Sequence, residues 1–225
     1  MLTCLCDAFY GEVGIATVKV LEHVGCEVAF EERQTCCGQP PFNAGDWKNS
    51  EAMARNCVDV FRGAEAVVVP SASCAAMMHE GYPMMGVEAT PKVYELSQFL
   101  LKVRAVEKWP ALASPKSCAF HRSCHGRMLR LENSQLDLLR LVGNLEIYEV
   151  PDADQCCGFG GAFSVTHGST SVGIGTAKLA RIGETGADLL VGGDMGCLMH
   201  LTTLAKKLGD DVRALHYVQI LAEAL

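Results

Sequence analysis

Eight of the twelve cysteines in this 225-residue chain fall into two sets with matching spacing. Each set has a single cysteine, then an adjacent pair followed by glycine, and then another single cysteine. The first set is Cys4, Cys36, Cys37 and Cys74, and the second is Cys124, Cys156, Cys157 and Cys197. In both sets, 31 residues separate the first cysteine from the pair. A repeat of so uncommon a pattern indicates that the chain consists of two related halves.

Four thiolates per half are the donor set of an iron–sulfur cluster or of a four-cysteine zinc site. Structural zinc sites usually take their ligands from C-x-x-C motifs, and this chain contains none. Adjacent cysteines direct their side chains apart, which suits several irons better than one tetrahedral ion. The glycine after each pair lets the backbone pass close to a bulky ligand. We therefore expect one iron–sulfur cluster per half, with zinc and metal-free thiols as the alternatives.

The composition indicates that these thiols stay reduced. Hydrophobic residues make up 49% of the chain and charged residues 20%, so it can bury a core without disulfide bonds. The first residues lack the features of a secretion signal, and no apolar stretch approaches the ~20 residues that cross a bilayer. A net charge of −7 without a basic cluster argues against a nucleic-acid partner. We expect a cytoplasmic protein, with membrane docking through partner subunits left open.

The segments between the cysteines must position them, and their hydrophobic patterns repeat from one half to the other. The first half is expected to contain a strand around Cys4, a helix over 12–25, a strand over 26–30, a helix over 46–63 and a strand over 66–70. The second is expected to contain a helix over 133–143, a strand over 145–150, a helix over 169–186 and a strand over 188–193. In both halves the last cysteine follows the last of these strands.

This alternation predicts an α/β fold of two pseudo-symmetric tandem modules, each a small, mostly parallel sheet flanked by helices. Pro110 and Pro115 interrupt the pattern between the halves, so we expect modules over residues 1–110 and 111–225. Ligands of parallel α/β units lie outside the carboxyl ends of the strands. The separated cysteines of each half can therefore converge on one edge of its sheet.

Some cysteines and histidines fall outside the repeat. Cys26, Cys57 and Cys118 are expected to be small buried hydrophobes. Cys6 lies two residues after Cys4, on the same face of the expected strand, and is a lesser candidate ligand. Two histidines, His121 and His125, flank Cys124. We expect them to hydrogen-bond the local turn or to tune the cluster from its surroundings.

The cysteine motifs resemble those of the CCG cysteine-rich domain family over both halves. The clearest stretches are TCCGQPPFNAG, VPSASCAAM, FHRSCH and CCGFGGAFSV. Within that family the chain looks most like the lactate-utilisation protein A branch, which is related to the CCG-containing subunit of heterodisulfide reductase and to the iron–sulfur subunit of glycolate oxidase. The resemblance implies that the eight matched cysteines are the cofactor and metal ligands. With four thiolates per half, the simplest expectation is two [4Fe–4S] clusters.

The resemblance also implies a function. The implied function is that the chain serves as an iron–sulfur electron-transfer subunit in a complex that oxidises L-lactate to pyruvate. The complex would contain two partner subunits, one of them ferredoxin-like. We expect no catalytic side chain in this chain itself. The alternatives are a thiol–disulfide reductase like heterodisulfide reductase, and a structural zinc module.

The chain departs from the fullest family pattern, which ends each module in C-x-x-C. Here Met77 and His200 stand three residues after Cys74 and Cys197, where the final cysteine would be. His200 is a lesser candidate to replace the missing thiolate, because imidazole can bind iron. Met77 is expected to pack in the core. The missing thiolates favour electron relay over disulfide chemistry.

Overall fold

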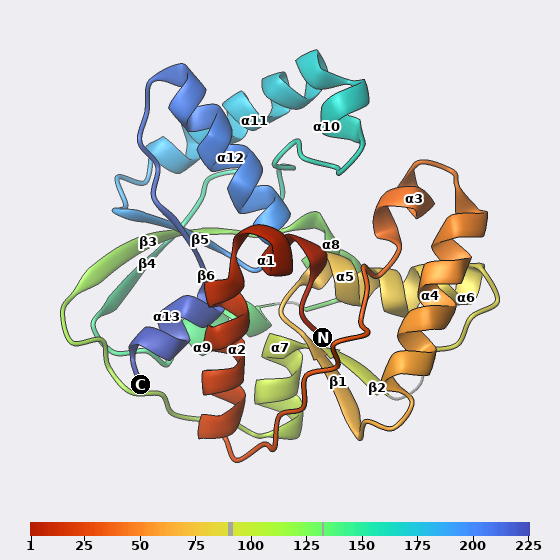
Figure 1. Ribbon diagram of the computed structural model, residues 1–225. Coiled ribbons are helices and arrows are strands. Elements are labelled where there is room, and N and C mark those ends of the chain that lie inside the picture. The colour runs from red at the N-terminus through yellow and green to blue at the C-terminus, as the bar shows by residue number, and fades with distance from the viewer. Residues whose placement is uncertain (90–91, 132) are drawn as a thin grey trace.

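Two parallel β-sheets with helices around them form the fold (Figure 1). The computed structural model describes residues 1–89, 92–131 and 133–225. Strands β1 (Ala66–Val69) and β2 (Lys92–Glu95) form one sheet. The other has the order β4-β3-β5-β6, from β3 (Lys116–His121), β4 (Leu145–Glu149), β5 (Leu189–Gly192) and β6 (Ala214–His216). All these strands pair in parallel, which confirms the expected α/β fold with small parallel sheets.

The helices follow the amphipathic patterns of the sequence. In the first half they are α1 (Cys4–Phe9), α2 (Gly11–His23), α3 (Gln39–Asn43), α4 (Trp47–Phe61), α5 (Ala72–Ala76), α6 (Tyr82–Met84) and α7 (Leu96–Gln98). In the second they are α8 (Cys124–Met128), α9 (Ser134–Arg140), α10 (Phe163–Thr166), α11 (Gly168–Gly183), α12 (Met195–Leu208) and α13 (Tyr217–Glu223). π-Helical turns over Met77–Gly81 and Phe99–Val103 extend α5 and α7. The four helices predicted from the sequence are α2, α4, α9 and α11.

Two predictions for the first half were wrong. Cys4 does not lie in a strand: it begins helix α1, because the hydroxyl of Thr3 accepts the backbone N–H of Cys6 and caps the helix. Residues 26–30 are not a strand in the described part of the chain, and none of them is buried, so little apolar contact holds them to a sheet. The first residue does lie along β1, because the amino group of Met1 donates to the carbonyl of Val68 at 2.8 Å.

The two halves are packed against each other. Helix α2 of the first half contacts α13 of the second, and one hydrophobic core contains residues of both. At the end of β2, the fully buried carboxylate of Glu95 accepts hydrogen bonds from Gln135 at 3.0 Å and from Tyr217 at 2.8 Å. Polar as well as apolar contacts therefore join the halves. The division into modules 1–110 and 111–225 stays a prediction.

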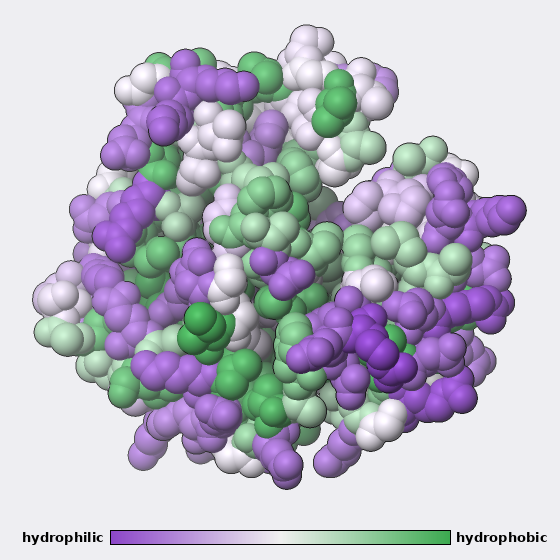
Figure 2. All heavy atoms as spheres, viewed as in Figure 1, coloured by the Kyte–Doolittle hydropathy of each residue, from purple (hydrophilic) through white to green (hydrophobic). Residues whose placement is uncertain are grey.

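The front face of the molecule shows where the halves meet. Apolar side chains gather over its centre, around α1 and α2, and polar ones surround them (Figure 2). The surface is hollowed between the lobe that carries α3 and the lobe that carries α10 (Figures 1 and 2). The cysteine pairs lie just before these two lobes in the chain, so the hollow leads toward the candidate site.

Candidate functional site

The four single cysteines lie in the first turns of helices that follow a strand or an extended segment. Cys4 and Cys124 are the first residues of α1 and α8, and Cys74 and Cys197 are the third residues of α5 and α12. The unpaired N–H groups of a helix start favour a negatively charged sulfur. The halves thus present their single thiols in the same way, one at a helix start and one two residues further in.

Each cysteine pair lies in a turn that only glycine can complete. Gly38 and Gly158 have φ angles of +89° and +90°, in the left-handed region. The hydroxyl of Ser50 in α4 donates to the carbonyl of Gly38 at 2.9 Å, and Ser171 in α11 donates to that of Gly158 at 2.8 Å. A Cβ on either glycine would meet the backbone oxygen of the same serine, at 3.0 and 2.5 Å. These serines, which the sequence patterns did not single out, fix both turns to the following helix.

The four thiols of the first half line one cavity of about 180 Å³. The sulfurs of Cys4 and Cys36 are 3.5 Å apart, and Cys37 is hydrogen-bonded to Cys36 and Cys74. Cys4 is exposed, whereas Cys37 and Cys74 are buried. Hydrogen bonds from Cys37 and Cys4 lower the pKa of the Cys36 thiol to about 3 and raise the pKa values of their own thiols. The set therefore has one thiol that ionises first, surrounded by three that can follow when a metal displaces their protons.

The second half contributes to the wall of this cavity. Residues 159–161 and 194–197 line it opposite the first-half cysteines. Asp194 at the start of α12 is buried, and its Oδ1 accepts the hydroxyl of Ser71 at 2.7 Å and the N–H of Ser73 at 3.0 Å. This carboxylate holds the loop before Cys74 against the loop before Cys197. Cys197 of the second set therefore lies in the wall of the cavity that the four thiols of the first set line.

The thiols of the second half form one row of neighbours, from Cys124 through Cys156 and Cys157 to Cys197. The sulfurs of Cys157 and Cys197 are 2.9 Å apart, and Cys124 is hydrogen-bonded to Cys156. Hydrogen bonds from Cys124 and Cys157 lower the pKa of Cys156 to about 2, and one from Cys157 lowers the pKa of Cys197 to about 7. Backbone N–H groups also donate to this set, from Gly158 to the Cys156 sulfur at 3.3 Å and from residue 159 to the Cys157 sulfur at 3.5 Å.

One histidine belongs to the second set by geometry. A ring nitrogen of His121 and the sulfurs of Cys157 and Cys197 all lie within 4.8 Å of one another. His121 is the last residue of β3 and is buried. The sequence places it only near Cys124, as a residue that bonds the turn or tunes the cluster. Its position at the carboxyl end of a strand is the sequence signal that could have identified His121 as a candidate metal ligand.

The lesser candidates lie at the edge of the two sets or outside them. The sequence predicted Cys6 on the same strand face as Cys4. Both residues are instead in helix α1, where side chains two residues apart are rotated by about 200° around the helix axis and so point to nearly opposite sides. Cys6 is 1% exposed and packs in the larger core. The Nε2 of His200 lies 3.4 Å from the hydroxyl of Ser171, behind the second turn. Met77 is buried in the smaller core, as expected.

The three remaining cysteines do not line the cavity of the first thiol set. Cys57 and Cys118 are buried in the hydrophobic cores, and Cys26 is half-buried. The sulfur of Cys57 lies 3.6 Å from the carbonyl of Cys36, beneath the first cysteine pair. Cys57 and Cys118 are therefore the small buried hydrophobes that the sequence predicts.

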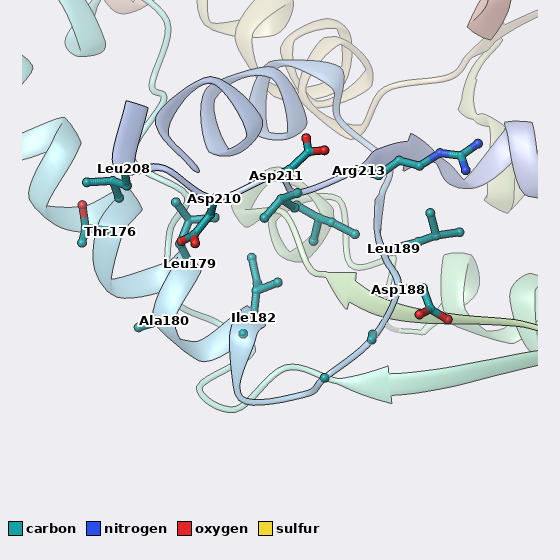
Figure 3. A pocket seen from close by; sticks show the side chains of 15 residues that line it. Thr176, Leu179, Ala180, Ile182, Asp188, Leu189, Leu208, Asp210, Asp211 and Arg213 are labelled. Atoms are coloured by element: carbon teal, nitrogen blue, oxygen red, sulfur yellow. The ribbon is translucent and has the colours of Figure 1, made fainter. Parts of the chain in front are cut away.

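A larger cavity lies at the other end of the second sheet. It measures about 530 Å³ and lies between α11, α12 and the segment before β6 (Figure 3). Its charged lining residues include Asp210, Asp211 and Arg213, and Figure 3 shows the Arg213 side chain directed away from the two carboxylates. No cysteine or histidine lines it among the described residues.

The model of the CCG cysteine-rich domain family matches residues 1–79 and 118–202. Each matched segment contains one complete cysteine set with its turn. The chain belongs to the CCG cysteine-rich domain family. Among its relatives, lactate utilization protein A of Geobacillus kaustophilus is 43% identical over 98% of this chain and 96% of that protein. Lactate utilization protein A of Halalkalibacterium halodurans is 41% identical over 98% of this chain and 94% of that protein.

A solved structure also matches, at low similarity. A putative Asp/Glu racemase from Yersinia pestis aligns over 99% of this chain and 94% of that chain, with 12% identity and a TM-score of 0.35. This similarity is too low to support any argument. The family assignment therefore rests on the CCG motifs and the full-length relatives. In the described residues, we find no helix with both the length and the apolar character required to cross a membrane.

The CCG thiols fit an iron–sulfur group. All four donors of the first half are sulfurs that surround a single cavity, and sulfur is the donor that such clusters take. In the second CCG turn, backbone N–H groups already point at sulfur, as in the turns that tune clusters. The cluster type and the ligand role of each cysteine are matters for proposal.

Proposed function

We propose that this CCG protein holds two [4Fe–4S] clusters and relays electrons in a complex that oxidises L-lactate to pyruvate. The observation that carries the proposal is the convergence of four thiols of the first half on one cavity. The repeated geometry of the second half supports a second centre. Relatives about 40% identical over nearly the whole chain are named lactate utilization proteins, which supports the substrate.

Eight cysteines would hold the two clusters: Cys4, Cys36, Cys37 and Cys74 in one half, and Cys124, Cys156, Cys157 and Cys197 in the other. Iron–sulfur clusters supply one-electron transfer. The chain itself would supply the ionised cysteine sulfurs around each cluster and would limit the contact of the cluster with water. Cys36 and Cys156, whose pKa values are lowered most, are the sulfurs expected to take iron first.

Oxidation of lactate to pyruvate releases two electrons and two protons, and one-electron carriers cannot remove a hydride from carbon. The pair must therefore leave the substrate at a redox cofactor of a partner protein. We propose a cytoplasmic complex with two partner subunits, one of them ferredoxin-like, between which this chain passes electrons singly. Cys197 supports a relay between the two centres, because it lies close to Cys157 and also lines the first-half cavity.

The proposal is tested by anaerobic purification of the full chain. Two clusters require about eight irons and about eight sulfides per chain, with an absorption near 400 nm that bleaches on reduction. A protein that holds less than one iron per chain after anaerobic reconstitution would refute the proposal. Stoichiometric zinc without iron would instead establish the zinc alternative.

One observation favours thiol–disulfide chemistry as a second candidate function. The sulfurs of Cys157 and Cys197, only 2.9 Å apart, are close enough for a disulfide to form with a small movement. In a reductase of this kind the thiols of Cys157 and Cys197 would reduce a disulfide substrate to two thiols and would become a disulfide themselves, and an added dithiol would reduce that disulfide again, all without partner proteins. Dithiol-dependent turnover by the iron-free chain that is lost in Cys197→Ser would establish the reductase.

A further inference from the structure

The second cysteine set contains a nitrogen donor at the place where its sheet ends. His121 is the last residue of β3 and pairs with Gly192, the last residue of β5. This register brings its ring to the start of α12, where Cys197 lies. A ring nitrogen of His121 and the sulfurs of Cys157 and Cys197 span at most 4.8 Å. Nitrogen and sulfur donors this close together can bind one metal centre.

The ring of His121 lies beside the thiol of Cys197, and a hydrogen bond between them helps to lower the pKa of that thiol. The side chain is 1% exposed, and in the described part of the chain neither buried ring nitrogen has an oxygen or nitrogen atom of the protein as its hydrogen-bond partner. Buried nitrogens of this kind are rare because each unpaired one destabilises the fold. Close to it in the described residues lie the thiols of Cys157 and Cys197, which a metal would bind. A metal bond from one nitrogen would satisfy it and hold the ring in place.

The other histidines near the thiols are already engaged. The Nε2 of His200 lies 3.4 Å from the Ser171 hydroxyl, and its ring lies beside Phe159. Both ring nitrogens of His125 have neighbours, the Cys124 sulfur at 3.6 Å and the side-chain amide of Gln39 at 3.1 Å. His121 is therefore the imidazole that is free to bind a metal.

In the described residues, the first set has no histidine at the equivalent position, and the imidazole that lines its cavity, that of His125, has neighbours on both ring nitrogens. His121 precedes Cys124 by three residues, and the residue three before Cys4 is Met1. The amino group of Met1 is directed to the backbone of β1, where it donates to Val68. Two halves that share the same thiols thus differ at this one position.

We propose that His121 is a ligand of the metal centre of the second half, where its nitrogen binds one iron in place of one of the four thiolates, while the first-half centre takes sulfur alone. The inference rests on the proposed function, in which each half holds a cluster. Replacing a thiolate by a neutral imidazole raises the reduction potential of a cluster, as histidine ligation does in Rieske centres. The second-half centre is therefore the one reduced first, and electrons that enter at the first-half centre are transferred to it.

The test uses the anaerobically purified full chain, reduced in steps and examined by pulsed electron paramagnetic resonance. Protein grown with nitrogen-15 histidine is compared with unlabelled protein, so that a nitrogen bound to iron changes its coupling with the label. We expect strong histidine nitrogen coupling in the centre reduced first, in the unmodified protein and in His200→Gln. We expect none in His121→Gln, with the potential of that centre lowered or its four irons lost.

A His121→Cys variant separates ligation from a structural role, because a thiolate restores a ligand without nitrogen. It should hold the iron of the unmodified protein while the nitrogen coupling disappears. Two filled clusters without strong nitrogen coupling in the unmodified protein, or with coupling that survives His121→Gln, would overturn this inference and leave the proposed function intact. A chain without iron would overturn both.

Discussion

The turn that presents Cys156 and Cys157 makes a sharp prediction about Gly158. An added Cβ would lie 2.5 Å from the carbonyl oxygen of Ser171 and 3.1 Å from the amide nitrogen of Gly175, both in the backbone of α11. Backbone atoms inside a helix cannot move aside without moving the helix. Gly158→Ala must therefore displace either the turn or α11.

The expected loss in the free energy of unfolding of Gly158→Ala is the sum of three contributions. A left-handed conformation costs a non-glycine residue about 1–2 kcal/mol, and overpacking costs a further ~1–3 kcal/mol. The lost hydrogen bond from Ser171 to the Gly158 carbonyl adds about 1 kcal/mol. We expect Gly158→Ala to lower the free energy of unfolding by about 4 kcal/mol. The matched control is Gly186→Ala, since Gly186 has a φ of +65° with open space around its Cβ, and it should cost about 1–2 kcal/mol.

The assay is urea unfolding of both variants and of the unmodified protein, prepared anaerobically with the thiols reduced. Iron analysis on the same samples should show Gly158→Ala with about four irons in place of about eight, because only the second turn is displaced. Equal losses of stability in the Gly158 and Gly186 variants would refute the reasoning, since they would show that contact with α11 contributes nothing.

Three further predictions follow from side chains around the two turns. Ser50→Ala removes the hydrogen bond to Gly38 and should lower the free energy of unfolding by about 1 kcal/mol in urea, whereas an unchanged value would contradict this role. Asp194→Ala leaves the Ser71 hydroxyl and a backbone N–H without their acceptor, and should cost about 2 kcal/mol in the same assay. Burial lowers the pKa of His216 to about 4 from its ordinary 6.5, so the unfolded chain binds its proton first as the pH falls. The unmodified protein should therefore lose up to about 3 kcal/mol between pH 6.5 and 4 relative to His216→Asn, and parallel pH profiles would exclude this.

The sequence predicted the repeated helices because amphipathic spacing and helix caps are local features. Helix α2 buries the apolar stripe that its spacing predicts, and α4 begins at Trp47, directly after Asp46, whose side chain caps it. The predicted strand around Cys4 failed for a local reason as well. A threonine cap at Thr3 outweighed a short apolar run, and the resulting helix turned Cys6 away from Cys4 into the core.

The parts that the sequence did not predict depend on contacts between distant segments. Ser50 and Ser171 act through carbonyls 12 and 13 residues earlier, and nothing in the local pattern marks a serine for that contact. His121 reaches Cys197 only because β3 lies beside β5 in a particular register. Asp194 joins loops that are 121 to 123 residues apart in the chain. Such pairings require the packed fold and cannot be read from spacing alone.

The central claim is that each cysteine set holds its own cluster, and iron with acid-labile sulfide in two matched variants tests it most directly. Cys36→Ser removes one thiolate from the first set and Cys156→Ser removes its counterpart from the second. We predict about eight irons in the unmodified chain, about four in each variant and less than one in the double variant. Unchanged iron in both single variants, or loss of all iron in either one, would contradict two independent centres.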